Sequence, residues 1–374
     1  MELHMKPQTI AVVGANGFIG SRLVAEALLN NGRVIALARK RRKHAPEKRV
    51  LDELEDNLTH EQITSFRENL TIFDYDLNEP QIGVSNSSLK TILDECVHVF
   101  NCVGDTTFFP RDREKLFSTN IDGPAHIVET LCKNGAVFHH VSTAYVAGDR
   151  EGVIYESERD KEQHFKNPYE ESKCLGEKKV HDVCTQKGIR YGIYRPSIVI
   201  RDHAIADKPP HLNHFYLFFN LLDSLYHEVQ KRVPVMEDGY YHVPVRFFGA
   251  KDSTLNIVDL DFVARALFYI GLHAPDSNKT YHLTNPQPIK NQRLLEIIME
   301  LFKIKGYVTV ENPEDFTDLN VYEKMLQEWF ANYLDYFFIN QEFNMTNTQA
   351  ALQGSGIQHP EFNKEYISRA SGRG

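Results

Sequence analysis

The sequence lacks the excess of positive charge that nucleic-acid-binding proteins carry. Its 374 residues include 42 Lys and Arg against 51 Asp and Glu, which gives a formal net charge of -9. Because binding to a phosphate backbone depends on a basic surface, this balance argues against DNA or RNA as a partner. The one local departure is a run of cations at residues 39–43.

Cysteines and long apolar runs are also scarce. The five cysteines show no CxxC or Cys/His spacing, so we expect neither a disulfide framework nor a metal site. No apolar run approaches the roughly 18 residues of a membrane span, and residues 1–8 do not resemble a signal peptide. We therefore expect a cytoplasmic protein without a membrane span.

Short apolar runs alternate with amphipathic stretches through the first half of the chain. With 42% apolar residues, the chain can bury one large core or two modest ones. The alternation, with its short connections, predicts a Rossmann-type α/β fold, in which helices cover both faces of a doubly wound parallel sheet. The expected strands are residues 9–13, 34–38, 71–76, 97–103, 137–141 and 190–200.

A glycine-rich turn follows the first expected strand and precedes the amphipathic stretch 21–29. In a dinucleotide site, Gly14 would allow a tight turn, Gly17 the approach of a pyrophosphate, and Gly20 close packing of helix on strand. The helix N-terminus would attract the phosphate charge. The alternative is a tight turn that binds nothing. The other cofactor contacts predicted in this turn are Asn16, Phe18 and Ile19.

The residues after the second and third strands indicate the form of the cofactor. An NAD site usually offers a carboxylate about 20 residues after the glycine turn, where it binds the ribose 2′-hydroxyl. This chain has Arg39 there, with Arg42 as a weaker second cation, so the sequence favours NADPH. Asp76 and Leu77 are candidate contacts to the adenine, although a plain turn at the strand end explains Asp76 equally well.

Tyr169 and Lys173 stand four residues apart at the head of a predicted helix that runs to about residue 187. This spacing places both side chains on one helical face, where an ammonium would lower the phenol pKa from its ordinary value of about 10. Thr143 follows the fifth strand, at the edge where ligands of such sheets bind. The hydroxyl and the Tyr/Lys pair can converge on one substrate oxygen, which makes Tyr169 a candidate proton donor.

The alternation of short apolar runs with amphipathic stretches ends after Arg201. Lys208, Pro209 and Pro210 break the chain, and residues 211–232 form a predicted helix with an aromatic stripe. The stripe suits an acyl chain, but ordinary domain packing explains it better. The expected domains are an NADP-binding domain at 6–201, to which 252–285 returns, a smaller and mainly helical substrate domain at 202–251 and 286–355, and a tail at 356–374.

Together these motifs closely resemble an extended short-chain dehydrogenase/reductase. The resemblance covers residues 8–285 and rests on GxxGxxG at 14–20, Ser142-Thr143, YxxxK at 169–173 and Arg195-Pro196-Ser197. Further similarity, to the thioester reductase and fatty acyl-CoA reductase branch, lies in residues 141–148, Glu156, residues 167–177 and residues 255–264.

The resemblance implies an NADPH-dependent reductase of acyl thioesters carried on CoA or a carrier protein. The product would be an aldehyde or, after a second hydride, an alcohol. Tyr169 would be the general acid, Lys173 would lower its pKa and bind the nicotinamide ribose, and Thr143 would hydrogen-bond the substrate oxygen. Asn120 would match the family's helix asparagine, and Pro196 would lie against the nicotinamide.

The chain departs from the family at residues 101–104, where His-x-Ala-Ala is frequent, and at Arg201, where a glycine is common. Two other functions stay open. A sugar-nucleotide epimerase, dehydratase or ketoreductase shares the scaffold, although a dehydratase usually has an acidic pair where this chain has Ala144 and Tyr145. A regulator that binds NADP without turnover would tend to lack the Tyr/Lys pair.

Overall fold

The computed structural model describes residues 8–41, 44–202, 214–274 and 278–372. The chain divides into two compact units. Unit 1 comprises Met1–Val199, Val258–Thr284 and Phe343–His359, and unit 2 comprises Ile200–Ile257, Asn285–Glu342 and Pro360–Gly374. Within the described ranges, no helix is both long enough and apolar enough to cross a membrane.

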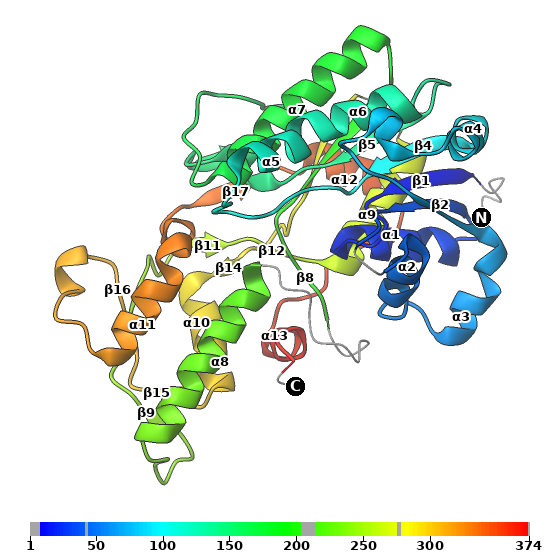
Figure 1. The fold of residues 1–374 in the computed structure, drawn as a ribbon. Coiled ribbons are helices and arrows are strands. Elements are labelled where there is room, and N and C mark those ends of the chain that lie inside the picture. The colour runs from blue at the N-terminus through cyan, green and yellow to red at the C-terminus, as the bar shows by residue number, and fades with distance from the viewer. Residues whose placement is uncertain (1–7, 42–43, 203–213, 275–277, 373–374) are drawn as a thin grey trace. The chain divides into compact units, whose positions relative to one another are not determined.

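A parallel sheet of seven strands forms the centre of unit 1 (Figure 1). Its order is β13-β7-β5-β4-β1-β2-β3, so the direction of winding reverses between β1 and β4. This arrangement confirms the predicted doubly wound fold, whose ligands bind at the carboxyl ends of the strands near such a reversal. The strands are β1 (Thr9–Val13), β2 (Arg33–Ala38), β3 (Leu70–Asp74), β4 (Cys96–Asn101), β5 (Val137–Val141), β7 (Tyr191–Pro196) and β13 (Thr280–Leu283).

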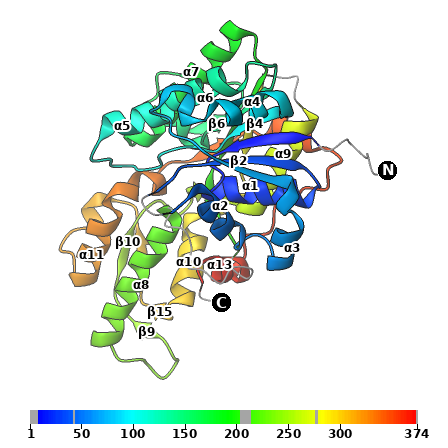
Figure 2. The ribbon, with the colours of Figure 1, turned by 45° about the vertical axis from the view of Figure 1, so that its right-hand side comes forward.

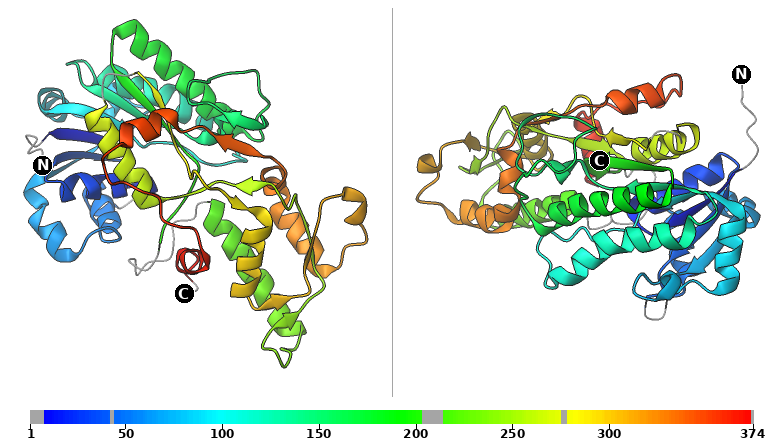
Figure 3. Two further views of the ribbon diagram at one scale, coloured as in Figure 1. Left: turned by 180° about the vertical axis from the view of Figure 1, so that it is seen from behind. Right: turned by 90° about the horizontal axis from the view of Figure 1, so that it is seen from above.

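Helices cover both faces of this sheet (Figure 2). One face carries α1 (Phe18–Leu29), α2 (Pro46–Leu54) and α9 (Leu260–His273), and α12 (Thr346–Leu352) lies beside α9 in the view from behind (Figure 3). The other face carries α4 (Asn86–Glu95), α6 (Gly123–Leu131) and α7 (Pro168–Lys187). The shorter elements of unit 1 are α3 (His60–Ser65), α5 (Arg113–Phe117) and β6 (Gly152–Ile154).

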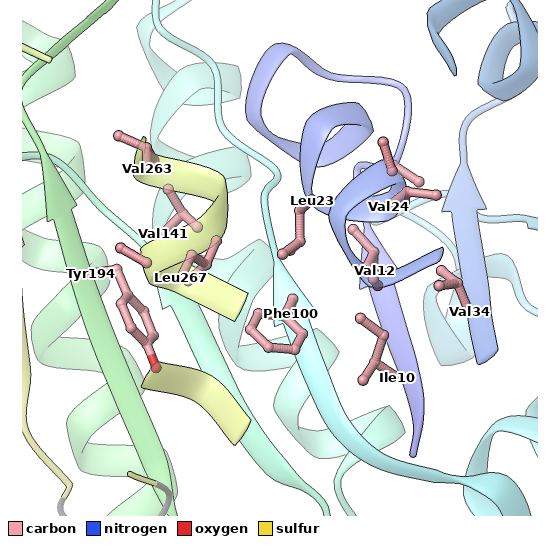
Figure 4. Packing of buried hydrophobic residues seen from close by; sticks show 14 of the residues in the cluster. Ile10, Val12, Leu23, Val24, Val34, Phe100, Val141, Tyr194, Val263 and Leu267 are labelled. Atoms are coloured by element: carbon pink, nitrogen blue, oxygen red, sulfur yellow. The ribbon is translucent and has the colours of Figure 1, made fainter. Parts of the chain in front are cut away.

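Alternate residues of the strands supply the two cores. Ile10 and Val12 of β1 belong to the cluster with α1 and α9, whereas Ala11 and Val13 belong to the cluster on the opposite face. Figure 4 shows the first cluster, in which Leu23 of α1 packs with Ile10 and Val12 of β1. Strands buried on both faces read as nearly continuous apolar runs, which is why the sequence revealed them.

Some elements of unit 1 differ from the expected ones. The strand expected at 190–200 is divided by Ser197 into β7 and β8 (Ile198–Ile200). Asn120, expected to open a helix, lies in a π-helical turn, Ser118–Asp122, between α5 and α6. In the segment that returns to unit 1, α9 begins at Leu260, and the Asp259 carboxylate caps it by accepting a hydrogen bond from the Phe262 N–H over 2.9 Å.

Unit 2 combines helices with short strands. The expected stripe on its first helix is buried at Phe215, Phe219 and Leu222, while residues 208–210 and Leu212 lie outside the described residues. The elements are α8 (His214–Arg232), β9 (Tyr241–His242), β10 (Arg246–Phe248), β11 (Thr254–Leu255), β14 (Ile289–Lys290), α10 (Asn291–Leu301), β15 (Ile304–Lys305), β16 (Val308–Val310), α11 (Val321–Phe330) and α13 (Lys364–Ala370). β12 (Ile257–Asp259) and β17 (Gln341–Phe343) lie where the chain passes between units.

The C-terminal part of the chain is divided differently from our expectation. Residues Phe343–His359 belong to unit 1, whereas we expected 343–355 in the substrate domain and 356–359 in the tail. The expected tail contains α13, whose Tyr366 and Ile367 are buried. The glycines at 354 and 356, near which we expected the folded part to end, lie in a connection between two structured segments.

Candidate active site

The glycine turn joins β1 to α1 and leaves no room for a side chain at Gly14 or Gly20. Gly14 has a φ of +82°, and a Cβ on Gly20 would lie 2.1 Å from the Gly14 carbonyl oxygen. The Gly17 N–H donates to the same oxygen over 2.9 Å. The first N–H groups of a helix have no acceptor within it, and they carry the positive end of its dipole. The turn, with Asn16, Phe18 and Ile19 half-buried around it, therefore fits a pyrophosphate.

Cations gather where β2 ends. Arg39 is exposed there, and its carbonyl oxygen accepts a hydrogen bond from the Arg49 guanidinium on α2. Burial, followed by Arg41 and Arg39, lowers the pKa of Arg49, which places three cations close together. Sequence reasoning missed Arg49, because it lies ten residues beyond Arg39 on a separate helix. Arg42 lies outside the described residues.

Asp76 and Leu77 follow β3 in a tight turn. The Asp76 Oδ1 atom accepts hydrogen bonds from the Asn78 backbone N–H over 3.0 Å and from the Asn78 side-chain amide over 2.9 Å. Leu77 packs beside the start of α6, where a Cβ on Gly123 would lie 2.8 Å from its Cδ1 atom. Both residues thus have a role in the turn itself, and a contact with adenine stays a prediction.

Tyr169, Thr143 and Pro196 come together from three different elements. Asn167 caps α7 by accepting a hydrogen bond from the Glu170 N–H over 3.1 Å, and this cap sets Tyr169 in the first turn. The hydroxyls of Tyr169 and Thr143 share a hydrogen bond. Thr143 follows β5 directly, and its Oγ1 atom lies 3.5 Å from the carbonyl oxygen of Pro196 at the end of β7.

The phenol of Tyr169 is held in its protonated form. Burial of the hydroxyl raises its pKa to about 12, although the bond with Thr143 acts in the opposite direction. This net direction is opposite to the one we expected from Lys173, because burial of the phenol raises its pKa by more than the Thr143 hydroxyl lowers it. Burial also lowers the pKa of Lys173 to about 8, against the opposing influence of Glu177. At neutral pH the pair therefore presents a phenol that can donate a proton.

The Asn120 side chain forms hydrogen bonds with two other parts of unit 1. Its Oδ1 accepts from the Asp105 N–H, and its Nδ2 donates to the Asp105 carbonyl and to the Ser172 hydroxyl, each over 2.8 Å. A Cβ on Gly176 would lie 2.3 Å from the Asn120 carbonyl oxygen, so α7 packs tightly on the π-helical turn. Asn120 thus ties the loop after β4 to the helix that carries Tyr169, and its catalytic role stays a prediction.

The departure at residues 101–104 has a local explanation. The Asn101 side chain lies 3.0 Å from the Nδ1 atom of His140 and accepts a hydrogen bond from the Val103 N–H, also over 3.0 Å. A Cβ on Gly104 would lie 3.7 Å from the Nζ atom of Lys173. Gly104 thus lies close to Lys173. The contact between Asn101 and His140 joins the neighbouring strands β4 and β5, which sequence spacing does not reveal.

Two buried carboxylates, Glu177 and Glu156, join separate elements of unit 1. Glu177 on α7 pairs with Arg195 on β7, with 2.9 Å from Nε to Oε1 and 2.6 Å from Nη2 to Oε2. Glu156 accepts hydrogen bonds from the backbone N–H groups of His282, Asn347 and Thr348 over 2.9, 2.5 and 3.1 Å. It therefore fixes the N-terminus of α12 against the edge strand β13.

Comparison with known proteins identifies a family whose model matches this chain. A family model described as Male sterility protein matches residues 12–267. Fatty acyl-CoA reductase 1 of Mus musculus is 27% identical over 158 residues, which cover 40% of this chain and 30% of that protein. Carboxylic acid reductase of Mycobacterium tuberculosis is 23% identical over 298 residues, which cover 75% of this chain and 24% of that protein. The chain thus corresponds to a minor part of each relative's length.

Solved structures share the fold. The terminal R domain from the myxalamid PKS-NRPS biosynthetic pathway has a TM-score of 0.76 at 19% identity, covering 98% of this chain and 90% of that one. UDP-glucuronic acid 4-epimerase from Bacillus cereus, in complex with NAD, has a TM-score of 0.61 at 16% identity, covering 97% of each chain. At such identities the likeness speaks for the fold alone. The family model spans most of the chain, and so this chain belongs to the male sterility protein family.

Proposed function

We propose that this protein uses NADPH to reduce an acyl thioester to an aldehyde and a thiol. The observation that carries the proposal is the pair of hydrogen-bonded hydroxyls on Tyr169 and Thr143, with the Tyr169 pKa raised to about 12. Reduction of a carbonyl needs a proton donor that is still protonated at working pH, and this phenol meets that need.

Thr143 and Tyr169 would have separate roles in the reaction. NADPH, when bound, supplies a hydride to the thioester carbonyl carbon. The Thr143 hydroxyl hydrogen-bonds the carbonyl oxygen, and Tyr169 donates its phenolic proton to that oxygen as negative charge develops there. The resulting hemithioacetal loses its hydroxyl proton, its C–S bond breaks as the C=O bond forms, and the sulfur takes up a proton and leaves as the thiol. A second reduction of the aldehyde would give the alcohol.

Lys173 and Asn120 would keep this arrangement in place. The Lys173 ammonium would bind the nicotinamide ribose, one helical turn beyond Tyr169 on the same face of α7. Asn120 holds the loop after β4 against α7 through its bonds with Asp105 and Ser172. Pro196 would lie against the nicotinamide ring, which the Thr143 contact at the end of β7 supports.

The remaining contacts support NADPH as the cofactor. The glycine turn would hold the pyrophosphate, and Asp76 and Leu77 would lie near the adenine. Arg39, together with Arg49 and Arg41, would bind the 2′-phosphate that distinguishes NADPH from NADH. Three neighbouring cations suit a phosphate dianion better than a ribose hydroxyl.

The relatives support a thioester as the substrate. Fatty acyl-CoA reductase and carboxylic acid reductase are both named for acyl reduction, and one fold neighbour is a thiolation-reductase di-domain. We therefore propose CoA or a carrier protein as the group that presents the acyl chain. Epimerases share the fold as well, so the test must separate the two chemistries.

The deciding experiment measures two products of one reaction. Purified protein is mixed with NADPH and a panel of acyl-CoA and acyl-pantetheine thioesters, while NADPH absorbance and free thiol are followed together. We expect one thiol for each NADPH consumed in the first reduction. UDP-sugars, tested for epimerisation in parallel with added NAD, serve as the comparison. Failure to release thiol from any thioester, or epimerisation without thioester reduction, would overturn the proposal.

A further inference from the structure

A second aromatic ring lies against Tyr169, the candidate proton donor. The Phe108 ring stacks on the Tyr169 ring, with centroids 5.9 Å apart and planes inclined by 22°. Offset stacking at this distance stabilises a pair of rings beyond what the burial of their area provides. Phe108 belongs to the loop that follows β4, so the contact joins two separate elements of unit 1.

The loop that carries this phenylalanine is attached to α7 on both sides of it. Before it, Asn120 joins the Asp105 backbone to the Ser172 hydroxyl through hydrogen bonds of 2.8 Å. After it, the Nη2 atom of Arg113 donates to the Glu171 carboxylate over 2.7 Å. Both partners on α7 lie within one turn of the tyrosine, so the loop and the start of the helix hold the two rings together.

The Tyr169 side chain has contacts at two places. Its hydroxyl shares a hydrogen bond with the Thr143 hydroxyl, and one face of its ring rests on Phe108. A tyrosine on a helix can adopt a χ1 angle near 180° or near −60° without entering the preceding turn, so the backbone alone does not decide between them. The stack favours the orientation in which the hydroxyl reaches Thr143.

We infer that Phe108 is a positioning residue for Tyr169, because its ring holds the phenol on the Thr143 hydroxyl. Its effect on turnover rests on the proposed function, whereas its effect on the phenol does not. Without the stack, the phenol would remain a proton donor but would spend less time at the substrate oxygen. We therefore expect its loss to lower kcat about threefold to tenfold, the worth of one aromatic pair, with KM nearly unchanged.

Phe109 provides a matched control. It is the same type of residue at the next position of the loop, and its side chain is 53% exposed. Phe108→Ala and Phe109→Ala therefore remove the same atoms from a stacked position and from an exposed one. Phe108→Tyr keeps a ring that can stack and should behave like the unaltered protein.

NMR of the full chain, labelled with ¹³C at the tyrosine Cζ atoms, tests the inference without any reaction. The Tyr169 signal is identified by its loss in Tyr169→Phe, and its displacement by Thr143→Val reports the hydrogen bond between the two hydroxyls. We expect this displacement to shrink at least twofold in the Phe108→Ala background and to keep its size in the Phe109→Ala and Phe108→Tyr backgrounds. An undiminished displacement in Phe108→Ala, or none in the otherwise unaltered protein, would overturn the inference.

Far-ultraviolet circular dichroism shows whether each variant is folded. If Phe108→Ala is not folded, Phe108→Leu takes its place, since it keeps apolar volume at the position and lacks only the ring.

Kinetics separate this inference from the proposed function. Thioester reduction by the unaltered protein tests the function itself. Where it occurs, Phe108→Ala should lower kcat, Phe108→Tyr should restore it, and Phe108→Ala should cost nothing further in Tyr169→Phe, because the hydroxyl that it positions is absent. An equal loss in both backgrounds would contradict the positioning role while the function stands. Absence of thioester reduction would overturn the function alone, and the NMR result would then decide the inference.

Discussion

The Nζ atom of Lys173 donates a hydrogen bond to the backbone carbonyl oxygen of Val141 over 2.7 Å. The ammonium is therefore anchored at the end of β5 by a neutral acceptor, and burial lowers its pKa to about 8. Tyr169, one turn earlier on the same helix, has its pKa raised to about 12. Of the two groups, Lys173 is thus the one that titrates near physiological pH.

The pH dependence of the reaction should follow Lys173. Because kcat/KM reports ionisations of the free enzyme, we expect it to be level below pH 8 and to fall above about pH 8, as the ammonium loses its proton. Initial rates with NADPH and thioester both well below saturation, so that most of the enzyme is free of cofactor, check the prediction when they are measured across this range. Lys173→Arg stays charged at all these pH values and should remove the fall. A profile that is level up to the ordinary lysine pKa of about 10 would contradict the assignment.

Replacement of the Tyr169 hydroxyl should remove the proton donor and little else. In Tyr169→Phe the ring keeps its stacking on Phe108, with centroids 5.9 Å apart. We expect kcat to fall by roughly 10²–10⁴-fold, the usual worth of a general acid, with KM for the thioester nearly unchanged. Tyr155→Phe, at a residue that is 49% exposed, is the matched control and should retain full activity. Undiminished turnover in Tyr169→Phe would refute the role given to the phenol.

Cofactor preference should depend on Arg39. Loss of a charged contact with the 2′-phosphate in Arg39→Ala should raise the Kd for NADPH by about tenfold, or roughly 1.4 kcal/mol, and leave the Kd for NADH unchanged. Quenching of intrinsic fluorescence gives both constants. Arg33→Ala is the control, since Arg33 lies at the other end of β2 in an exposed pair with Glu95 at 3.6 Å. An equal rise in the Kd for both cofactors would show that Arg39 does not bind the 2′-phosphate.

Glu156 should matter for stability more than for chemistry. In Glu156→Gln the charged acceptor of the N–H groups of His282, Asn347 and Thr348 is lost. We expect the free energy of unfolding in urea to drop by about 2 kcal/mol, the scale of a hydrogen bond to a charged group. The exposed Glu151→Gln variant should lose almost none. A fall in kcat of folded Glu156→Gln without a loss of stability would mean that the carboxylate acts on the site instead.

Local pattern was enough to predict the sheet and the order of the motifs. β1 and β5 coincide with the expected strands, since buried parallel strands are short apolar runs bounded by glycine or polar residues. The helix that carries Tyr169 ends at Lys187 as expected, because Gly188 follows it with a left-handed φ of +65°.

Features that depend on distant residues could not be predicted in this way. The π-helical turn at Asn120 exists where α7 packs against it at Gly176, and the partners of Glu156 lie more than a hundred residues further along the chain. The direction of the Tyr169 pKa depends on burial, which no spacing of Tyr and Lys reveals.

The return of residues Phe343–His359 to unit 1 has a consequence for synthesis. Met345 belongs to the same core cluster as Ile10 and Leu23, and Thr348 bonds Glu156 through its N–H and its hydroxyl. The ribosome makes these partners only after the central segments of unit 2 have emerged. Unit 1 is therefore completed only after most of unit 2 has been made, and until then the growing chain carries an unfinished Rossmann core, with α12 still missing from the face that α9 shares.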